Sequence, residues 1–302
     1  DIVVIDEFHH AQARTYRDVL AHLTPQELLG LTATPERSDG TDVAATFFDG
    51  RTAAELRLWD ALGSDLLSPF HYFAVADGTD LSGLTWKRGG YDTDALNDMY
   101  TGNDARAALI LKAVGDKIAD PRSMRALGFC VSIAHAQYMA RVFSDAGVPA
   151  AAVTSGPESP DRAQTLTDLR DGRIAAIFTV DMFNEGVDLP TIDTVLFLRP
   201  TESSTIFLQQ LGRGLRRANG KAVLTALDFV GHQNKQFRFA DRFRADHGGE
   251  AVGAVLLLRA DVLFLREQLA VLERGQARLD HHIAFEIEHP LEILERHVHQ
   301  QA

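Results

Sequence analysis

Two adjacent carboxylates, Asp6 and Glu7, follow the apolar run of residues 2–5 at the start of the sequence. An apolar run of this length predicts a strand of a parallel sheet that is covered on both faces. One carboxylate at the end of such a strand could hold Mg²⁺ through water, and its neighbour could orient a water molecule for phosphoryl transfer. The alternative is a pair of N-cap acids for the helix that follows.

Polar residues also follow two other predicted strands. The stretch Leu-Thr-Ala-Thr-Pro ends the second strand and places Thr32 and Thr34 where hydroxyl groups could relay position between a nucleotide site and a neighbouring domain. Ordinary capping before the proline is the alternative. Further along, Thr179 ends a strand and is followed by a loop that contains Gly186 and Asp188, which would also fit a plain turn.

Gln209, Arg213 and Arg216 have the i, i+4, i+7 spacing of one helix face. Guanidinium groups on such a face could neutralise the charge that develops on a transferred phosphate. A solvated basic face is the alternative. Residues 199–244 contain nine Lys or Arg against three Asp or Glu, which favours contact with phosphate groups.

These side chains can act together only if strands and helices bring them to the same edge of a sheet. The sequence predicts an α/β fold with parallel sheets. Strand, helix and strand follow one another in residues 1–68, which predicts one unit of such a sheet. Residues 69–105 are expected to be a connector with some strand character. Residues 106–247 predict a complete doubly wound domain with its functional loops at the carboxyl ends of the strands. Residues 248–302 are expected to be a mainly helical tail of unknown role.

Composition limits the class of protein. With 302 residues, 45% of them hydrophobic, the chain is expected to be soluble and to form about two domains. No signal peptide is visible, and no apolar run approaches the roughly 20 residues that span a bilayer, so no membrane partner is expected. The single cysteine, Cys130, fits a reducing compartment, taken to be the cytoplasm. The formal net charge of −12 argues against nonspecific coating of nucleic acid.

Taken in order, these stretches resemble the motifs of the superfamily 2 helicases. Asp-Glu-Phe-His at 6–9 is similar to their second, DEAH-type motif, and Thr-Ala-Thr at 32–34 to the third. Residues 179–190 are similar to the fifth motif, 209–216 to the sixth and, more weakly, 129–132 to the fourth. The string from 31 to 40 resembles type III restriction helicase subunits. The resemblance covers about residues 1 to 244 and implies two RecA-like domains that use ATP and Mg²⁺ to act on nucleic acid, with DNA favoured over RNA.

The resemblance also implies a role for each site residue. Asp6 would hold Mg²⁺ through water and Glu7 would be the catalytic base, while His9 would couple to Gln209. The other implied roles are contacts to the nucleotide and its ribose (Gly186, Asp188), coupling of the domains (Thr32, Thr34), arginine fingers (Arg213, Arg216) and contacts to the nucleic-acid backbone (Ser132, Thr154, Thr179).

One family motif, a glycine-rich phosphate loop that ends in Gly-Lys-Ser or Gly-Lys-Thr, is absent. The Gly-Lys pair of this sequence, Gly220 and Lys221, is followed by Ala222 on a different element. We therefore expect the first RecA-like domain to be truncated at its amino terminus, and the chain alone to be inactive. The family often attaches a nuclease or other effector domain, and none is recognisable here.

The sequence thus predicts the motor portion of an ATP-dependent helicase or translocase. A restriction-type translocase that pumps duplex without separating it is one alternative. A noncatalytic RecA-like scaffold that binds a partner or nucleic acid is the other.

Overall fold

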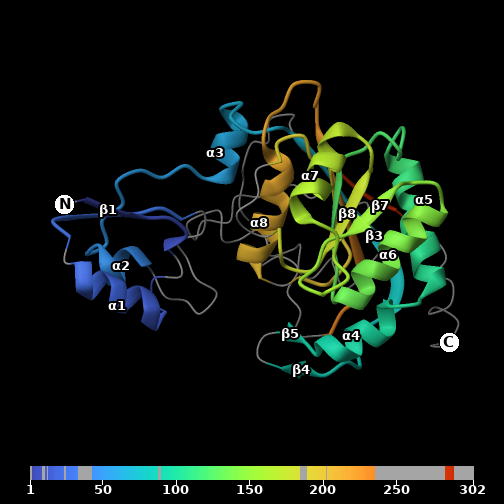
Figure 1. Cartoon of the computed structure of the whole chain (residues 1–302), viewed down its shortest axis with the longest axis horizontal. Coiled ribbons are helices and arrows are strands. Elements are labelled where there is room, and N and C mark those ends of the chain that lie inside the picture. Colours follow the sequence, from blue (N-terminus) through green and yellow to red (C-terminus); the bar gives the residue numbers. More distant parts are fainter. Residues whose placement is uncertain are drawn as a thin grey trace, which may run out of the picture.

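The computed structural model describes residues 2–8, 11, 13–23, 25–32, 43–87, 90–183, 189–201, 203–234 and 283–288 (Figure 1). These residues form a two-stranded sheet, a seven-stranded sheet and a short hairpin. Every strand pair in the first two sheets is parallel. The predicted α/β class with parallel sheets is therefore confirmed.

The amino-terminal unit is a strand-helix-strand motif. β1 (Ile2–Ile5) pairs in parallel with β2 (Glu27–Gly30), and α1 (Arg14–Leu23) lies between them in the sequence. A short helix, α2 (Val43–Phe47), follows. This order is the one predicted for residues 1–68.

β1 is covered on one face only by the described residues, whereas cover on both faces was expected. Ile5 packs against a cluster that contains the buried side chains of Phe8 and Val43. On the other face Ile2 is 68% exposed and Val4 is 56% exposed. The difference arises because successive side chains of a strand point to opposite faces, and the described helices of this unit cover one of them.

The second sheet has the strand order β11-β3-β10-β9-β6-β8-β7. In that order the strands are β11 (Ile283–Glu288), β3 (Phe70–Asp80), β10 (Leu224–His232), β9 (Thr194–Phe197), β6 (Ala126–Phe129), β8 (Ala176–Thr179) and β7 (Ala150–Ala152). Every residue of β6, β8 and β9 is buried. Parallel strands buried in this way require helices on both sides of the sheet.

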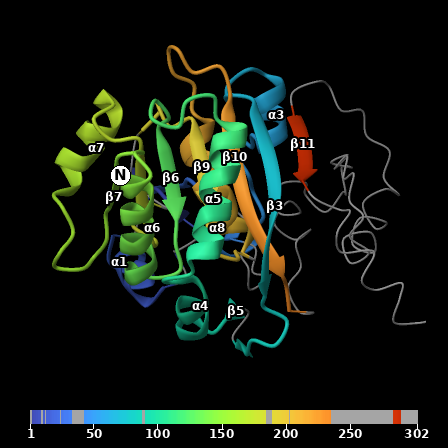
Figure 2. The same cartoon turned by 90° about the vertical axis from the view of Figure 1, so that its right-hand side faces the viewer.

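Helices cover both faces of this sheet, with α5 in front and α8 behind in Figure 2. One hydrophobic cluster joins Ala126 of β6 to α5 (Asp104–Lys117) and α6 (Ile133–Asp145). The other joins the next residue, Leu127, to α3 (Leu58–Gly63), α7 (Arg162–Asp171) and α8 (Ser204–Leu215). None of the helices in the described part of the chain is long and apolar enough to cross a membrane.

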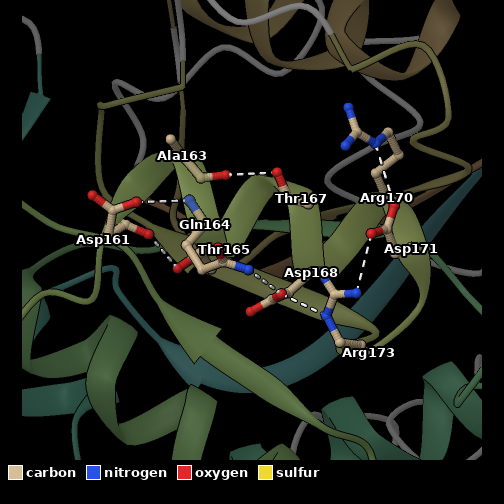
Figure 3. Close-up of polar contacts among 9 residues, drawn as sticks. All are labelled: Asp161, Ala163, Gln164, Thr165, Thr167, Asp168, Arg170, Asp171 and Arg173. Atoms are coloured by element: carbon tan, nitrogen blue, oxygen red, sulfur yellow. Dashed lines mark hydrogen bonds and ion pairs between the residues drawn. The ribbon is translucent and has the colours of Figure 1, made fainter.

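The crossover helix α7 shows how local contacts build the sheet connections (Figure 3). The Asp161 carboxylate caps the start of α7 by accepting a hydrogen bond from the backbone amide of Gln164 at 2.7 Å. Along its exposed side, Asp168 Oδ1 accepts hydrogen bonds from Gln164 Nε2 at 2.8 Å and from Arg173 Nε at 2.7 Å. Gly172, with φ 79°, ends the helix. Because α7 connects β7 to β8, these contacts help to position the polar residues that follow β7 and the start of β8.

Two further segments contribute strands to the second sheet. β3 lies within residues 69–105, yet its 11 residues make it a full strand of the second sheet instead of a link. The same segment also forms the hairpin of β4 (Trp86–Lys87) and β5 (Gly90–Tyr91), followed by α4 (Thr93–Tyr100). In the tail, which was expected to be mainly helical, the described residues Ile283–Glu288 form a strand, and the rest of the tail lies outside the described residues.

Candidate nucleotide and nucleic-acid site

The acid pair and Thr32 lie at the same edge of the two-stranded sheet. The parallel register places Ile5 opposite Gly30, so the residues after both strands emerge side by side. Two backbone hydrogen bonds continue this alignment, from the Leu31 amide to the Ile5 carbonyl at 2.9 Å and from the Phe8 amide to the Leu31 carbonyl at 2.8 Å. The structure therefore brings together two of the sequence-predicted motifs.

The backbone turns sharply at the acid pair. Glu7 has φ 51°, in the left-handed region that residues other than glycine rarely adopt. The Asp6 carboxylate accepts a hydrogen bond from the Glu7 amide at 2.9 Å. α1 begins only at Arg14, so neither carboxylate is placed as its N-cap. This geometry does not support the N-cap alternative for α1.

The three residues predicted to meet nucleic acid also share one edge of a sheet. Ser132 follows β6, Thr179 ends β8 and Thr154 follows β7, and these three strands are neighbours in the order β6-β8-β7. The loop after β7 reaches the start of α6, because a methyl group added at Gly156 would lie 3.4 Å from Thr154 Oγ1 and 3.6 Å from Ile133 Cγ2. The carboxyl edge of the second sheet thus carries all three residues.

The hydroxyl groups of these residues are largely engaged or covered. Ser132 caps α6 by accepting a hydrogen bond from the His135 amide at 3.0 Å, and its hydroxyl donates to Asn97 of α4. Thr154 Oγ1 accepts a hydrogen bond from the Gly156 amide at 3.2 Å. Thr179 is fully buried, and its hydroxyl has no hydrogen-bond partner among the described residues. Direct contact between Thr179 and a phosphate therefore requires this edge to open.

α8 presents the residues predicted to act on the nucleotide. Gln209 and Arg213 are partly exposed and are linked by a hydrogen bond of 3.4 Å from Arg213 Nε to the Gln209 carbonyl, whereas Phe207 and Leu211 face the core. The predicted helix face is confirmed for this pair. It does not extend to Arg216, because α8 ends at Leu215 and Arg216 is the extended C-cap residue, with φ −65° and ψ 138°.

Two residues that were not predicted as site residues hold the end of α8. Ser68 and Lys221 donate hydrogen bonds to the last carbonyl groups of the helix. In the sequence, Lys221 belongs to a Gly-Lys pair that is not part of a phosphate loop. Backbone carbonyls are present at every residue, so no side-chain pattern signals which of them a lysine will bind.

Four predicted site residues lie outside the described residues. They are His9, Thr34, Gly186 and Asp188. Within the described part, no group of three or more His, Cys, Asp or Glu side chains is placed to hold a metal ion.

Two protein-family models match the chain. The model of the helicase conserved C-terminal domain matches residues 109–218, which include the polar strand ends of the second sheet and α8. The model of the res subunit of type III restriction enzymes matches residues 1–37, which include the acid pair. Both parts of the predicted site therefore lie within matched segments.

Curated relatives extend beyond the length of this chain. A 51.5 kDa protein of a Lactococcus phage (isolate 7-9) is 27% identical over 226 residues, which cover 74% of this chain and 48% of the phage protein. A Saccharomyces cerevisiae protein that bears the name of an ATP-dependent helicase, IRC3, is 27% identical over 237 residues, which cover 76% of this chain and 34% of the yeast protein. The chain thus spans less than half the length of these two relatives.

A solved structure has the same fold. It is a fragment from Vibrio vulnificus YJ016, described as an HsdR subunit of a type I restriction enzyme, with a TM-score of 0.61 and 24% identity over 80% of this chain and 46% of that chain. The likeness supports RecA-like architecture for the parallel sheets. The two family models and the yeast relative thus make the chain similar to superfamily 2 helicases, and residues 1–37 are similar to restriction-enzyme subunits.

Proposed function

We propose that the chain is the motor part of an ATP-dependent helicase or translocase that hydrolyses ATP between two RecA-like domains. The observation that carries this proposal is the parallel pairing of β1 and β2, which puts Asp6 and Glu7 beside Thr32 at one strand edge. We assign residues 1–68 to the first domain, except for α3 and Ser68, which contact the second sheet and α8. We assign residues 106–247, together with β3, to the second domain. Residues 81–105 and 248–302 have no assigned role in the motor.

In this proposal the two domains contribute opposite charges to the nucleotide site. Asp6 holds Mg²⁺ through water, and Glu7 orients the attacking water molecule. A single carboxylate at a strand end fits an ion that keeps several waters and takes its other ligands from nucleotide phosphates. When bound, Mg²⁺ would neutralise part of the phosphate charge. Arg213 and Arg216 stabilise the charge that develops during transfer, from the side of the second domain.

The remaining predicted residues couple hydrolysis to movement on nucleic acid. Ser132 and Thr154 lie at the edge at which the second domain meets the nucleic-acid backbone, and the buried Thr179 contacts the backbone only when this edge opens. The remaining site residues have two proposed roles. Gly186 and Asp188 contact the nucleotide and its ribose, whereas Thr32 and Thr34, and His9 through Gln209, couple the nucleotide site to the movement of the domains.

The 302 residues contain no Gly-Lys-Ser or Gly-Lys-Thr, because the one Gly-Lys pair is followed by Ala222. The groups that usually grip the β and γ phosphates are the amides and lysine of such a loop. We therefore propose that residues outside these 302 supply them, and that ATP turnover belongs to the full gene product.

ATP turnover by the full gene product, measured with and without DNA, tests the proposal. Glu7→Gln should nearly abolish turnover while nucleotide binding persists, because the amide keeps the shape of the side chain but is a poor base. Glu27→Gln, which changes an exposed carboxylate on β2 of the same sheet, is the matched control and should leave turnover unchanged. Wild-type turnover in Glu7→Gln would remove Glu7 from the mechanism.

The arginines of α8 need a separate comparison. Arg213→Ala should lower turnover on the order of 10³-fold if Arg213 acts as an arginine finger. Arg170→Ala removes an exposed arginine of α7 that pairs with Asp171, and it should have little effect (Figure 3). A loss below about tenfold for Arg213→Ala would favour a solvated basic face.

Binding to nucleic acid should be directed at the backbone and therefore sensitive to salt. The basic excess in residues 199–244 motivates this expectation. The logarithm of the affinity should fall linearly with the logarithm of the salt concentration, and duplexes of unrelated sequence should bind alike. Affinity that stays constant from low to moderate salt would contradict it.

A restriction-type duplex translocase is the second candidate, and the match of residues 1–37 to a restriction-enzyme subunit favours it. Displacement of a third strand from a triplex, with the underlying duplex left paired, would support this candidate. Release of one strand from a forked duplex would support a helicase. Absence of ATP turnover in the full gene product would favour the remaining alternative, a noncatalytic RecA-like scaffold.

A further inference from the structure

The last carbonyl groups of α8 are bound by two residues that lie outside the helix. Such carbonyls have no partner within a helix, so each needs another donor. The Ser68 amide donates to the Leu215 carbonyl at 2.7 Å, and Ser68 Oγ donates to the Arg216 carbonyl at 3.1 Å. Lys221 Nζ donates to the Arg216 carbonyl at 2.7 Å and also to the Gly214 carbonyl. We call Ser68 and Lys221 the α8 clamp.

The sheet topology brings the two residues of the α8 clamp together. Ser68 lies two residues before β3, and Lys221 lies three residues before β10. β3 and β10 pair in parallel with Phe70 opposite Leu224, so their amino ends lie side by side beneath the end of α8. A turn closed by a hydrogen bond from the Lys221 amide to the Ala218 carbonyl at 3.2 Å carries the chain from α8 back to β10. Gly220, with φ 81°, permits this turn.

Lys221 also joins α8 to the end of a second motif. Its Nζ donates to the Pro190 carbonyl at 3.3 Å, and Pro190 closes the stretch from 179 to 190 that resembles the fifth helicase motif. An ammonium group has three N–H donors, and the three carbonyls of Pro190, Gly214 and Arg216 match that number. Its positive charge also lies at the negative end of the α8 dipole.

We propose that Lys221 is a positioning residue that holds Arg213 and Arg216 in register with Pro190. This inference rests on the proposed function, since it assigns Lys221 to the action of the arginines on the nucleotide. Arg213 lies in the last turn of α8 and Arg216 is its C-cap residue, so fraying of that turn would displace both guanidinium groups. Because the Lys221 ammonium binds both Pro190 and the end of α8, a shift of either one affects the position of the other.

The effect of Lys221 should be local, with little change in global stability. Burial lowers the pKa of Lys221 to about 8, and the nearby charge of Asp193 acts in the opposite direction. The lost solvation of the ammonium therefore offsets part of what its hydrogen bonds contribute. Lys221 remains partly exposed, so water can reach the carbonyls that a shorter or apolar side chain would release.

Two readouts on the full gene product test the inference, with the variants Lys221→Met and Lys221→Arg. Hydrogen exchange of the amides in residues 212–215 reports whether the end of α8 frays. The kcat and KM for ATP report whether the arginines still act in the transition state. The control is Lys112→Met, which removes an exposed lysine of α5 that pairs with Asp116.

Lys221→Met should speed exchange at the end of α8 and lower kcat by roughly 10-fold to 100-fold, with KM changed by less than about twofold. Lys221→Arg should recover most of kcat, because a guanidinium group remains charged and can donate to several carbonyls. Lys112→Met should match the wild type in both readouts.

Unchanged exchange at residues 212–215 in Lys221→Met would overturn the inference, as would an unchanged kcat in an active enzyme. Equal damage to kcat and KM, or failure of Lys221→Arg to recover activity, would also overturn it. A wild-type protein without ATP turnover would count against the proposed function. Hydrogen exchange at residues 212–215 would then still test whether Lys221 holds the end of α8.

Discussion

Asp77 of β3 and Arg106 of α5 form an ion pair of 2.7 Å, with both charged groups almost completely removed from solvent. The Arg106 guanidinium also donates to the Leu198 carbonyl at 3.1 Å and lies 3.8 Å from the centroid of the Tyr100 ring. Leu198 directly follows β9, so one guanidinium joins β3, α4 and α5 to the carboxyl edge of the second sheet. This pair attaches the segment that had been expected to be a connector to the domain that carries the site.

Asp77→Asn should destabilise the protein by about 3 kcal/mol or more, because it leaves the buried Arg106 charge without a counter-ion. Denaturation with urea, monitored by the fluorescence of the chain, would measure the loss. The matched control is Asp116→Asn in the exposed Lys112–Asp116 pair, which should cost less than about 1 kcal/mol. Equal and small losses in both variants would show that the Asp77–Arg106 pair is not buried as described.

The two glycines of α8 should respond in opposite ways to replacement by alanine. A methyl group at Gly214 would lie 2.4 Å from Leu224 Cδ1 and 2.8 Å from Leu224 Cδ2, while a methyl group at Gly212 meets nothing within 4 Å. Leu224 is fully buried, so its side chain can shift only by displacing core neighbours. Gly214→Ala should therefore destabilise by roughly 1–3 kcal/mol, and Gly212→Ala should stabilise by up to about 1 kcal/mol through helix propensity. Thermal unfolding of the Gly214→Ala and Gly212→Ala variants tests the packing of α8 on β10. Equal melting temperatures for the two variants would contradict this packing.

His135 should make the protein less stable in mild acid. Burial lowers the pKa of His135 to about 3, and the charge of Arg106 acts in the same direction. At a pH between about 3 and the ordinary histidine pKa of about 6.5, His135 binds a proton in the unfolded chain but not in the folded chain. This contribution to stability is present above about pH 6.5 and is lost as the pH falls, by about 1.4 kcal/mol for each pH unit well below 6.5.

His135→Asn provides the comparison for this effect. His135 Nδ1 accepts a hydrogen bond from the Val131 amide at 3.3 Å, and an asparagine amide oxygen is able to accept in its place without titrating. The unfolding free energy of the wild type should fall more steeply from pH 7 to pH 5 than that of the variant. Parallel pH profiles for the two proteins would show that His135 is not responsible.

The 302-residue chain by itself should bind ATP weakly and should not hydrolyse it. The sequence contains no Gly-Lys-Ser or Gly-Lys-Thr to supply the amides and lysine that hold the β and γ phosphates. Calorimetric titration with ATP and Mg²⁺, combined with a phosphate-release assay, measures both properties. Saturable binding in the micromolar range with release of phosphate would show that other residues of this chain grip the phosphates.

Local pattern was sufficient for much of the fold and for part of the site. The doubly wound domain expected over residues 106–247 contains β6, β8, β9 and β10, each of which is a short, mostly apolar run, and Gly172 ends α7. The acid pair and Thr32 were expected at strand ends, and the parallel register of β1 and β2 places them together. Such features depend on side-chain periodicity and turn chemistry within a few residues, which a sequence displays directly.

Contacts between distant segments could be decided only by the tertiary structure. β3 pairs with β10, and Asp77 meets Arg106, across separations that carry no shared local pattern. The end of α8 at Leu215 and its contacts with Ser68 and Lys221 depend on backbone carbonyl groups, which are chemically the same at every residue. Sequence alone therefore determined which residue types stand at the strand ends and on α8, while the packing of β3 beside β10 decided what holds the arginines of α8 in place.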